Sequence, residues 1–92
     1  MKKMTVYAAT ATHSKYGERI MKLYANPTDA RKHCLSKYME EMNKLFEREA
    51  FGEGRIKRYS DDECWYEWVD DPNKKMGFDI KERFWVKCMD VD

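Results

Sequence analysis

With 92 residues, the chain is long enough for one domain, spanning 1–92, with a single core and a shallow site rather than a deep pocket. Its 18 Lys and Arg residues nearly balance its 17 Asp and Glu residues, and the net charge of +1 excludes a strong whole-molecule field. The three cysteines are an odd number and form no C-x-x-C pair, which argues against a secreted disulfide scaffold and favours free thiols in a reduced, cytoplasmic protein.

The first predicted element is a β-hairpin. The segment from Met4 to Thr12 is rich in Thr, with Val and Tyr, and it alternates as a strand does. A turn-like stretch at 13–17 contains a glycine, and Arg19 to Ala25 then alternates again. This second alternation predicts two faces. One face carries Met21, Leu23 and Ala25, and the other carries Ile20, Lys22 and Tyr24.

A long helix is predicted next. Asn26 can cap the free N–H groups, Pro27 fits the first helical position, and Asp29 suits the positively polarised first turn. We expect the helix to run to about Glu49, before Gly52. An apolar stripe predicts that one side of this helix lies on a sheet. The stripe consists of Ala30, Cys34, Leu35, Tyr38, Met42, Leu45 and Phe46. The opposite side carries His33, Lys37, Glu40, Lys44 and Glu47.

The C-terminal part of the chain is predicted to return to strands. Cys64 to Val69 has a strand's composition, and the stretch from Arg55 to Tyr59 is a candidate for a short strand before it. A loop with strong turn chemistry occupies Asp71 to Gly77. The segment from Phe78 to Met89 alternates throughout, and its apolar side is interrupted by Glu82. The two strands that flank the loop form a second hairpin.

These elements define the fold class. The order β-β-α-(β)-β-β predicts an α+β fold, with an antiparallel sheet of four to five strands and one long helix on one face. A single helix covers only one face of the sheet. The other face is therefore open to solvent or to a partner.

Residues with catalytic or metal-binding chemistry do not form a recognisable site in the sequence. His13, His33 and the cysteines are far apart and lack the spacing of a zinc site. His33 is adjacent to Cys34, but neighbouring residues on a helix do not face each other, so they do not form a nucleophile and its base. The glycines are scattered and form no phosphate-binding loop. We therefore expect no metal, no cofactor and no enzymatic activity.

Charge predicts which strand residues lie on the open face, because Glu67 and Lys81 are costly to bury. By that rule the open face carries Tyr24, Trp65, Glu67, Lys81, Arg83, Trp85 and Lys87. The same reasoning adds Lys22 and Tyr7. Trp, Tyr and Arg are enriched at the centres of protein interfaces, so this face is a candidate binding surface. The alternative is that long Lys and Arg stems simply cover the rings.

An acidic segment is a second candidate surface. Six of the twelve residues from 60 to 71 are acidic and three are aromatic. Its binding candidates are Asp61, Asp62, Glu63, Asp70 and Asp71. Such a segment can dock on a basic partner. The alternative is that these charges protect the strand between them from edge-to-edge aggregation.

The opening MTVYAATATHSKYGERIMKLYANPTDARKH, a hairpin followed by a capped helix, is similar to the start of many small phage and bacterial α+β proteins. In its size and its richness in Lys, Glu, Met and aromatic residues, the whole chain resembles small accessory proteins of tailed bacteriophages, including those that neutralise host defences. The resemblance implies a stoichiometric binder of a host protein, such as an inhibitor of a host defence or regulatory enzyme, in the host cytoplasm.

The expected function is therefore a non-enzymatic protein-binding module. The runner-up is a nucleic-acid-binding protein, in which aromatic rings on the open face stack on bases and Lys22, Lys81, Arg83 and Lys87 meet phosphates. Glu67 and the acidic segment count against that reading. A homodimer that covers Trp65 and Trp85 is a further option. We expect no membrane partner and no signal peptide, because the start of the chain has only a short apolar stretch and no segment approaches the ~20 apolar residues of a span.

Overall fold

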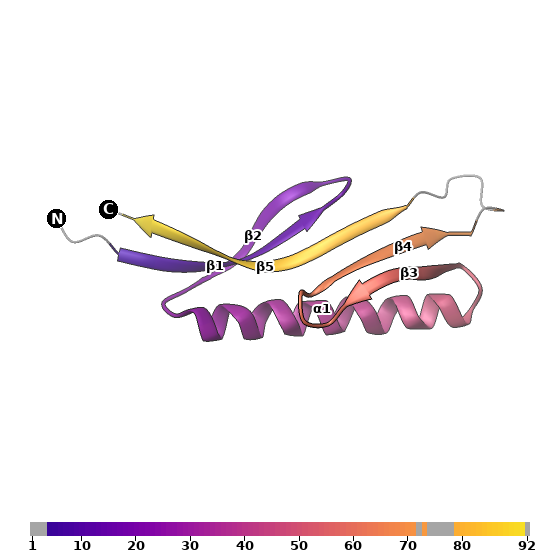
Figure 1. Ribbon diagram of the computed structural model, residues 1–92, viewed down its shortest axis with the longest axis horizontal. Coiled ribbons are helices and arrows are strands. Elements are labelled where there is room, and N and C mark those ends of the chain that lie inside the picture. The colour runs from indigo at the N-terminus through magenta and orange to yellow at the C-terminus, as the bar shows by residue number, and fades with distance from the viewer. Residues whose placement is uncertain (1–3, 72, 74–78, 92) are drawn as a thin grey trace.

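The computed structural model describes residues 4–71, 73 and 79–91, which form a five-stranded antiparallel sheet with one long helix on one face (Figure 1). The elements are β1 (Met4–His13), β2 (Gly17–Tyr24), α1 (Pro27–Ala50), β3 (Gly54–Ser60), β4 (Trp65–Asp70) and β5 (Ile80–Val91). The strands lie in the order β2-β1-β5-β4-β3. The predicted α+β class and chain order are confirmed, and the short strand expected at 55–59 exists as β3. Most of the predicted loop at 71–77, and Phe78, lie outside the described residues.

The helix begins where the capping residues predicted. The Asn26 side chain accepts a hydrogen bond of 2.9 Å from the backbone N–H of Asp29, and Pro27 occupies the first helical position. The helix ends at Ala50, one residue beyond the expected end, and Gly52 follows with a φ of +76°. In the part of the chain that the structure describes, no helix is both long and apolar enough to cross a bilayer.

The core lies between α1 and the sheet. Ala9 and Ala11 of β1 are fully buried, and such small side chains let a helix pack closely against the strand. From the helix, the buried residues are Ala30, Cys34, Tyr38, Met42 and Leu45. The sheet adds Tyr66, Trp68 and Phe84, of which Trp68 has no exposed surface. All three cysteines are free thiols, as predicted.

The predicted apolar stripe of α1 was too wide. Leu35 and Phe46 were assigned to it, yet each remains 45% exposed. They lie at the margin of the stripe, where the sheet covers the helix only in part. Phe46 packs instead edge-on against Tyr59 of β3, with 6.1 Å between the ring centroids.

A β-bulge reverses the predicted faces of the second strand. Ala9 lies opposite Lys22, but Thr10 lies opposite Ile20, so Met21 is an extra residue in β2. One extra residue moves every side chain beyond it to the other face of a strand. Tyr24 therefore faces α1, where its hydroxyl lies 2.8 Å from Nδ1 of His33.

The predicted positions of Tyr24, Lys22 and Tyr7 on the open face are consequently wrong. Tyr7 lies directly opposite Tyr24 and shares its side of the sheet. Lys22 lies opposite the buried Ala9, and its Nζ is 5.3 Å from the Tyr24 ring centroid. The bulge leaves no mark in the simple alternation of residues along β2.

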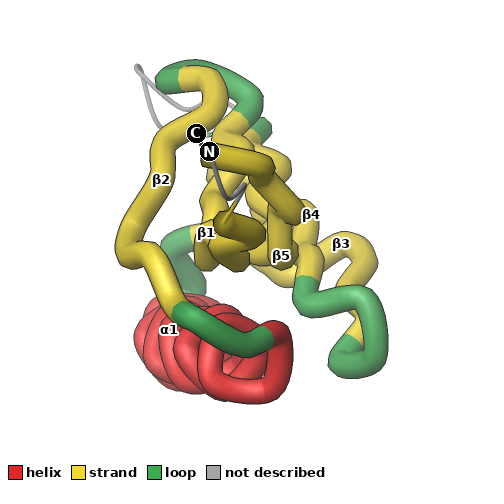
Figure 2. Tube along the Cα trace, turned by 90° about the vertical axis from the view of Figure 1, so that its left-hand side faces the viewer, coloured by secondary structure: helices red, strands yellow, loops and turns green. Residues whose placement is uncertain are grey.

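The molecule is long and narrow, with principal extents of 58, 20 and 15 Å. Figure 2, viewed along the long axis, shows α1 on one side of the sheet, and the described residues form no second layer on the other side. At one end of the molecule, β1 and β5 continue as a two-stranded ribbon, in which residues 4–6 pair with residues 89–91 (Figure 1).

Candidate functional site

The sheet face opposite α1, here called the open face, is defined by the register of the strands. Trp65 lies opposite Arg83, Glu67 lies opposite Lys81, and the buried Glu82 and Phe84 alternate with them on the helix side. The open face carries Thr12, Glu18, Arg55, Arg58, Trp65, Glu67, Lys81, Arg83, Trp85 and Lys87, and Thr10 on the same side of the sheet is fully buried. Charge predicted seven residues for this face, and six of them lie on it: Trp65, Glu67, Lys81, Arg83, Trp85 and Lys87. The seventh, Tyr24, faces the helix.

Trp65 lies at the centre of a cationic cluster. The guanidinium carbon of Arg58 is 4.8 Å from the ring centroid, and Nζ of Lys81 is 5.2 Å from it. The indole Nε1 donates a hydrogen bond of 2.8 Å to Glu63. The ring is half-buried rather than bare, so it has the covered arrangement that the sequence left as an alternative.

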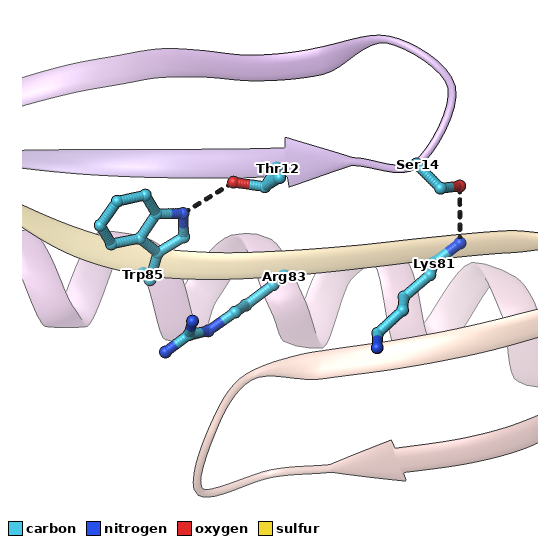
Figure 3. Close-up of a pocket in the computed structure, with 5 residues that line it drawn as sticks. All are labelled: Thr12, Ser14, Lys81, Arg83 and Trp85. Atoms are coloured by element: carbon cyan, nitrogen blue, oxygen red, sulfur yellow. Dashed lines mark hydrogen bonds between the residues drawn. The ribbon is translucent and has the colours of Figure 1, made fainter.

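Trp85 forms a second pair of the same kind. The guanidinium carbon of Arg83 is 5.8 Å from the Trp85 ring centroid, and the indole Nε1 donates a hydrogen bond of 2.8 Å to the Thr12 hydroxyl. Figure 3 shows the indole directed toward β1, while Lys81 and Arg83 extend to the other side of β5. Together with Ser14, these residues line a shallow hollow of about 280 Å³.

The hollow is fixed by backbone contacts between the first hairpin and β5. The hydroxyl of Ser14 accepts a hydrogen bond of 3.0 Å from the backbone N–H of Lys81, and the Ser14 N–H donates to the Lys81 carbonyl at 2.8 Å. The β1–β2 turn is thereby attached to the start of the described part of β5. The side chains of Thr12 and Trp85 are held on this same junction.

The open face is more basic than the whole molecule. Five cationic strand side chains lie on it against two strand carboxylates, and Glu63 of the β3–β4 turn adds a third carboxylate beside Trp65, which leaves a surplus of two positive charges. The cations are Arg55, Arg58, Lys81, Arg83 and Lys87, and the strand carboxylates are Glu18 and Glu67. Lys87 and Glu18 form an ion pair at 3.1 Å. Glu67 lies between Arg58 and Lys81 in the register of the sheet.

Arg58 and Arg55 were missed by the sequence reasoning. Their strand was expected, but its register against β4 was not readable. A shift in pairing between Ile56 and Arg58 makes Lys57 an extra residue, and this puts both arginines on the same face. The signal that pointed toward them was only the basic composition of residues 55–58.

No family model, curated protein or solved structure matches this chain. The role of the open face is therefore inferred from its own residues.

The acidic candidates do not form one surface. Asp61, Asp62 and Glu63 lie in the β3–β4 turn, whereas Asp70 and Asp71 lie at the far end of β4. A strand of this length separates its ends by roughly 20 Å. The two groups are therefore separate features of the molecule.

Two of these acids have structural partners on the helix side. Asp61 accepts a hydrogen bond of 3.1 Å from the Tyr38 hydroxyl, and Asp70 accepts one from the indole Nε1 of Trp68 at 2.6 Å. Arg48 also lies 3.5 Å from Asp70. These contacts tie β4 and the β3–β4 turn to α1.

Two titratable groups of the core are the buried thiols of Cys34 and Cys64. Burial raises the pKa of the Cys34 and Cys64 thiols, which makes them poor nucleophiles. His13 accepts backbone hydrogen bonds of 3.0 and 3.3 Å within the β1–β2 turn. Among the described residues, no three His, Cys, Asp or Glu side chains gather as a metal site would require.

Proposed function

We propose that this protein is a non-enzymatic binding module whose open face holds an acidic surface of a partner protein. The observation that carries the proposal is the pairing of cations with indoles: Arg58 and Lys81 over Trp65, and Arg83 over Trp85. A cation resting on an indole is held in place before a partner arrives, so less side-chain freedom is lost on binding. Its N–H groups remain available for carboxylates.

The composition of the face supports an acidic protein partner in particular. The surplus of positive charge favours an acidic surface and steers its approach. Trp and Arg are the residue types that most often dominate the binding energy of protein interfaces. The resemblance to phage accessory proteins supports the further proposal that the partner is a host defence or regulatory protein in the host cytoplasm.

Single-stranded nucleic acid is the second candidate, and the excess of cations over carboxylates on this face favours it. Its weakness is the state of the rings. Bases stack on uncovered aromatic faces, whereas Trp65 and Trp85 already carry cations. A polyanion would therefore meet cations before it met rings.

The test is affinity capture from a bacterial lysate with mass spectrometry, carried out with and without nuclease. The decisive variant is Lys81→Glu with Arg83→Glu, which reverses two charges on the open face. Arg31→Glu with Lys32→Glu is the matched control, because it makes the same change at exposed positions of α1. We expect the open-face variant alone to lose a partner that nuclease does not remove. Equal capture by both variants would contradict the proposal, and nuclease-sensitive capture would favour the second candidate.

A further inference from the structure

β5, which lies at the centre of the sheet, has an edge that no described strand covers. β4 pairs with β5 only from Ile80 to Arg83, and a backbone hydrogen bond of 2.9 Å from the Phe84 N–H to the Cys64 carbonyl closes this contact. β5 then continues to Val91, paired on its other side with β1 along the whole length. In Figure 1, β1 and β5 run on together past the turn that joins β3 to β4.

The backbone groups on this edge can be assigned from the direction of the Phe84 amide. Successive residues of a strand direct their N–H and C=O groups to alternate sides. Because Phe84 is directed toward β4, the groups of Val86, Cys88 and Asp90 point to the same side, beyond the start of β4. Such a row of donors and acceptors is a template for another strand.

The two outer edges of the sheet are protected, whereas this inner edge is not. β2 and β3 each contain a bulge, which disfavours pairing with a further strand. Their charged side chains are Glu18, Arg19, Lys22, Arg55, Lys57 and Arg58. The β5 edge pairs with β1 without a register shift, and within the described residues of β5 the only charged side chains beyond Phe84 are Lys87 and Asp90, which have opposite signs.

The two-stranded ribbon beside this edge has no neighbouring strand to stabilise it among the described residues. Residues 4–6 and 89–91 pair only with one another among the described residues, and a two-stranded ribbon is marginally stable in water unless further strands join it. Its open-face side is apolar. That side carries Met4, Val6, Met89 and Val91. The ribbon is the part of the sheet that gains most from additional strands.

We propose that two copies of this chain associate by antiparallel pairing of their β5 edges around a two-fold axis at Cys88. In this register Val86 of one copy lies opposite Asp90 of the other, and the two Cys88 residues lie opposite each other, so the donors of each edge meet the acceptors of the other. Each copy supplies both β5 and β1, which turns the ribbon into four strands. The sheet becomes continuous across the dimer.

Charge and length favour a second copy over a foreign strand. The paired segment has no net charge and the whole chain has a net charge of only +1, so two copies do not repel strongly. The β5 edges of the two copies are equal in length by symmetry, so each edge is paired over its full length in the dimer. A single foreign strand would leave its own outer edge unpaired. The dimer also leaves Trp65, Lys81 and Arg83 accessible, so the proposed partner-binding face is not consumed.

The first experiment measures the molar mass by light scattering after size exclusion, across a range of concentrations and in the presence of a reductant. We expect twice the monomer mass of 11.1 kDa. Cys88→Pro removes an N–H that the monomer does not use for its β1 pairing, and two such groups are lost per dimer. We expect it to weaken the dimer about tenfold or more, with an unchanged circular dichroism spectrum. Cys88→Ala, which keeps the N–H, is the matched control.

The second experiment uses the unmodified protein, so it does not depend on the folding of a variant. Amide hydrogen exchange of Val86, Cys88 and Asp90 is expected to slow as concentration rises, with no such change at the outer strands β2 and β3. A monomer at about 100 µM with fast exchange at these three amides would overturn the proposal. So would a dimer whose affinity is the same in Cys88→Pro and Cys88→Ala. Protection that appears only when a different protein is added would assign the edge to a foreign strand instead.

Discussion

Glu82 places a carboxylate on the helix-facing side of β5, where burial without partners would cost several kcal/mol. The Tyr66 hydroxyl donates a hydrogen bond of 2.9 Å to it, and Arg19 lies 3.4 Å from its other oxygen. Burial, and then the adjacent carboxylate, raise the pKa of Tyr66, so its hydroxyl stays protonated and continues to donate. The charge rule that correctly placed Glu67 and Lys81 on the open face fails at Glu82, because its partners come from other strands.

His33 makes the stability of the fold depend on pH. The sequence placed it on the solvent side of α1, but it is half-buried beside Tyr24, and its Nε2 has no partner among the described residues. Burial, and next the charges of Lys37 and Lys22, lower the pKa of His33 from its ordinary 6.5. The unfolded chain therefore binds a proton more readily than the folded chain. The stability that neutral His33 contributes is fully present above the unfolded pKa and is lost as pH falls through the folded pKa.

We accordingly expect the melting temperature to fall between about pH 7 and about pH 5, and to fall less in His33→Gln, which cannot take up a proton in this range. Circular dichroism at constant ionic strength measures both proteins. His13→Gln is the control, because His13 is the last residue of β1 and contacts the backbone of the β1–β2 turn rather than the core. A decline of equal size in all three proteins would show that His33 does not carry the effect.

The contribution of the Trp85 aromatic ring to partner binding can be separated from the contribution of its apolar volume. We expect Trp85→Phe to keep most of the partner binding, since it retains a ring under Arg83 and loses only the hydrogen bond to Thr12. Trp85→Leu is expected to weaken binding by about 2 kcal/mol or more, as at a hot spot, because no ring remains. Titration calorimetry with the captured partner gives the affinities, and circular dichroism reports folding. Equal losses in the two variants would mean that the cation–ring pair is not the source of affinity.

At the scale of the elements, the sequence predicted most of the secondary structure because the signals are local. Asn26 and Pro27 fixed the start of the helix, and alternation located the strands to within a residue or two. The misplaced residues depend on contacts between elements. Tyr24 changed face because of the bulge at Met21, and Arg58 reached the open face through the shift in β3, neither of which leaves a mark in the alternation of its own strand.

The true width of the helix stripe leads to a stability prediction. Leu45 is 5% exposed and Leu35 is 45% exposed, although both were assigned to the same stripe. We expect Leu45→Ala to destabilise the protein by about 2–5 kcal/mol through lost burial and a cavity. Leu35→Ala is the matched control, with an expected cost below about 1 kcal/mol. Urea denaturation measures both, and similar costs for the two variants would contradict the observed placement of the helix.

At the scale of the whole molecule, a net charge of +1 conceals a strongly uneven surface. The open face carries a surplus of cations, while Asp61 of the β3–β4 turn and Asp70 at the end of β4 are held by partners on the helix side of the sheet. Composition alone predicted a weak overall field, and it could not place the charges, because their positions depend on the register of five strands. The basic face therefore emerges only from the assembled sheet.

This distribution leads to a prediction about nucleic acid. We expect no appreciable binding to single-stranded RNA or DNA at physiological salt, since the indole faces that bases require already carry cations. Fluorescence anisotropy with labelled oligonucleotides measures this directly. Binding at about micromolar affinity, lost in Lys81→Glu with Arg83→Glu but kept in Arg31→Glu with Lys32→Glu, would make nucleic acid the leading candidate.

The first and last strands of the chain lie side by side in the sheet, and in the ribbon at one end Thr5 hydrogen-bonds to Asp90, 85 residues away. During synthesis the ribosome releases β1 long before β5 exists. The helix has no complete sheet to pack on until the final strand emerges, because Phe84 of β5 belongs to the core. Folding therefore waits for nearly the whole chain, and non-local pairing of this kind is slow and leaves apolar segments exposed in the meantime. A nascent chain of this protein is a candidate client for the chaperones that wait at the ribosome exit.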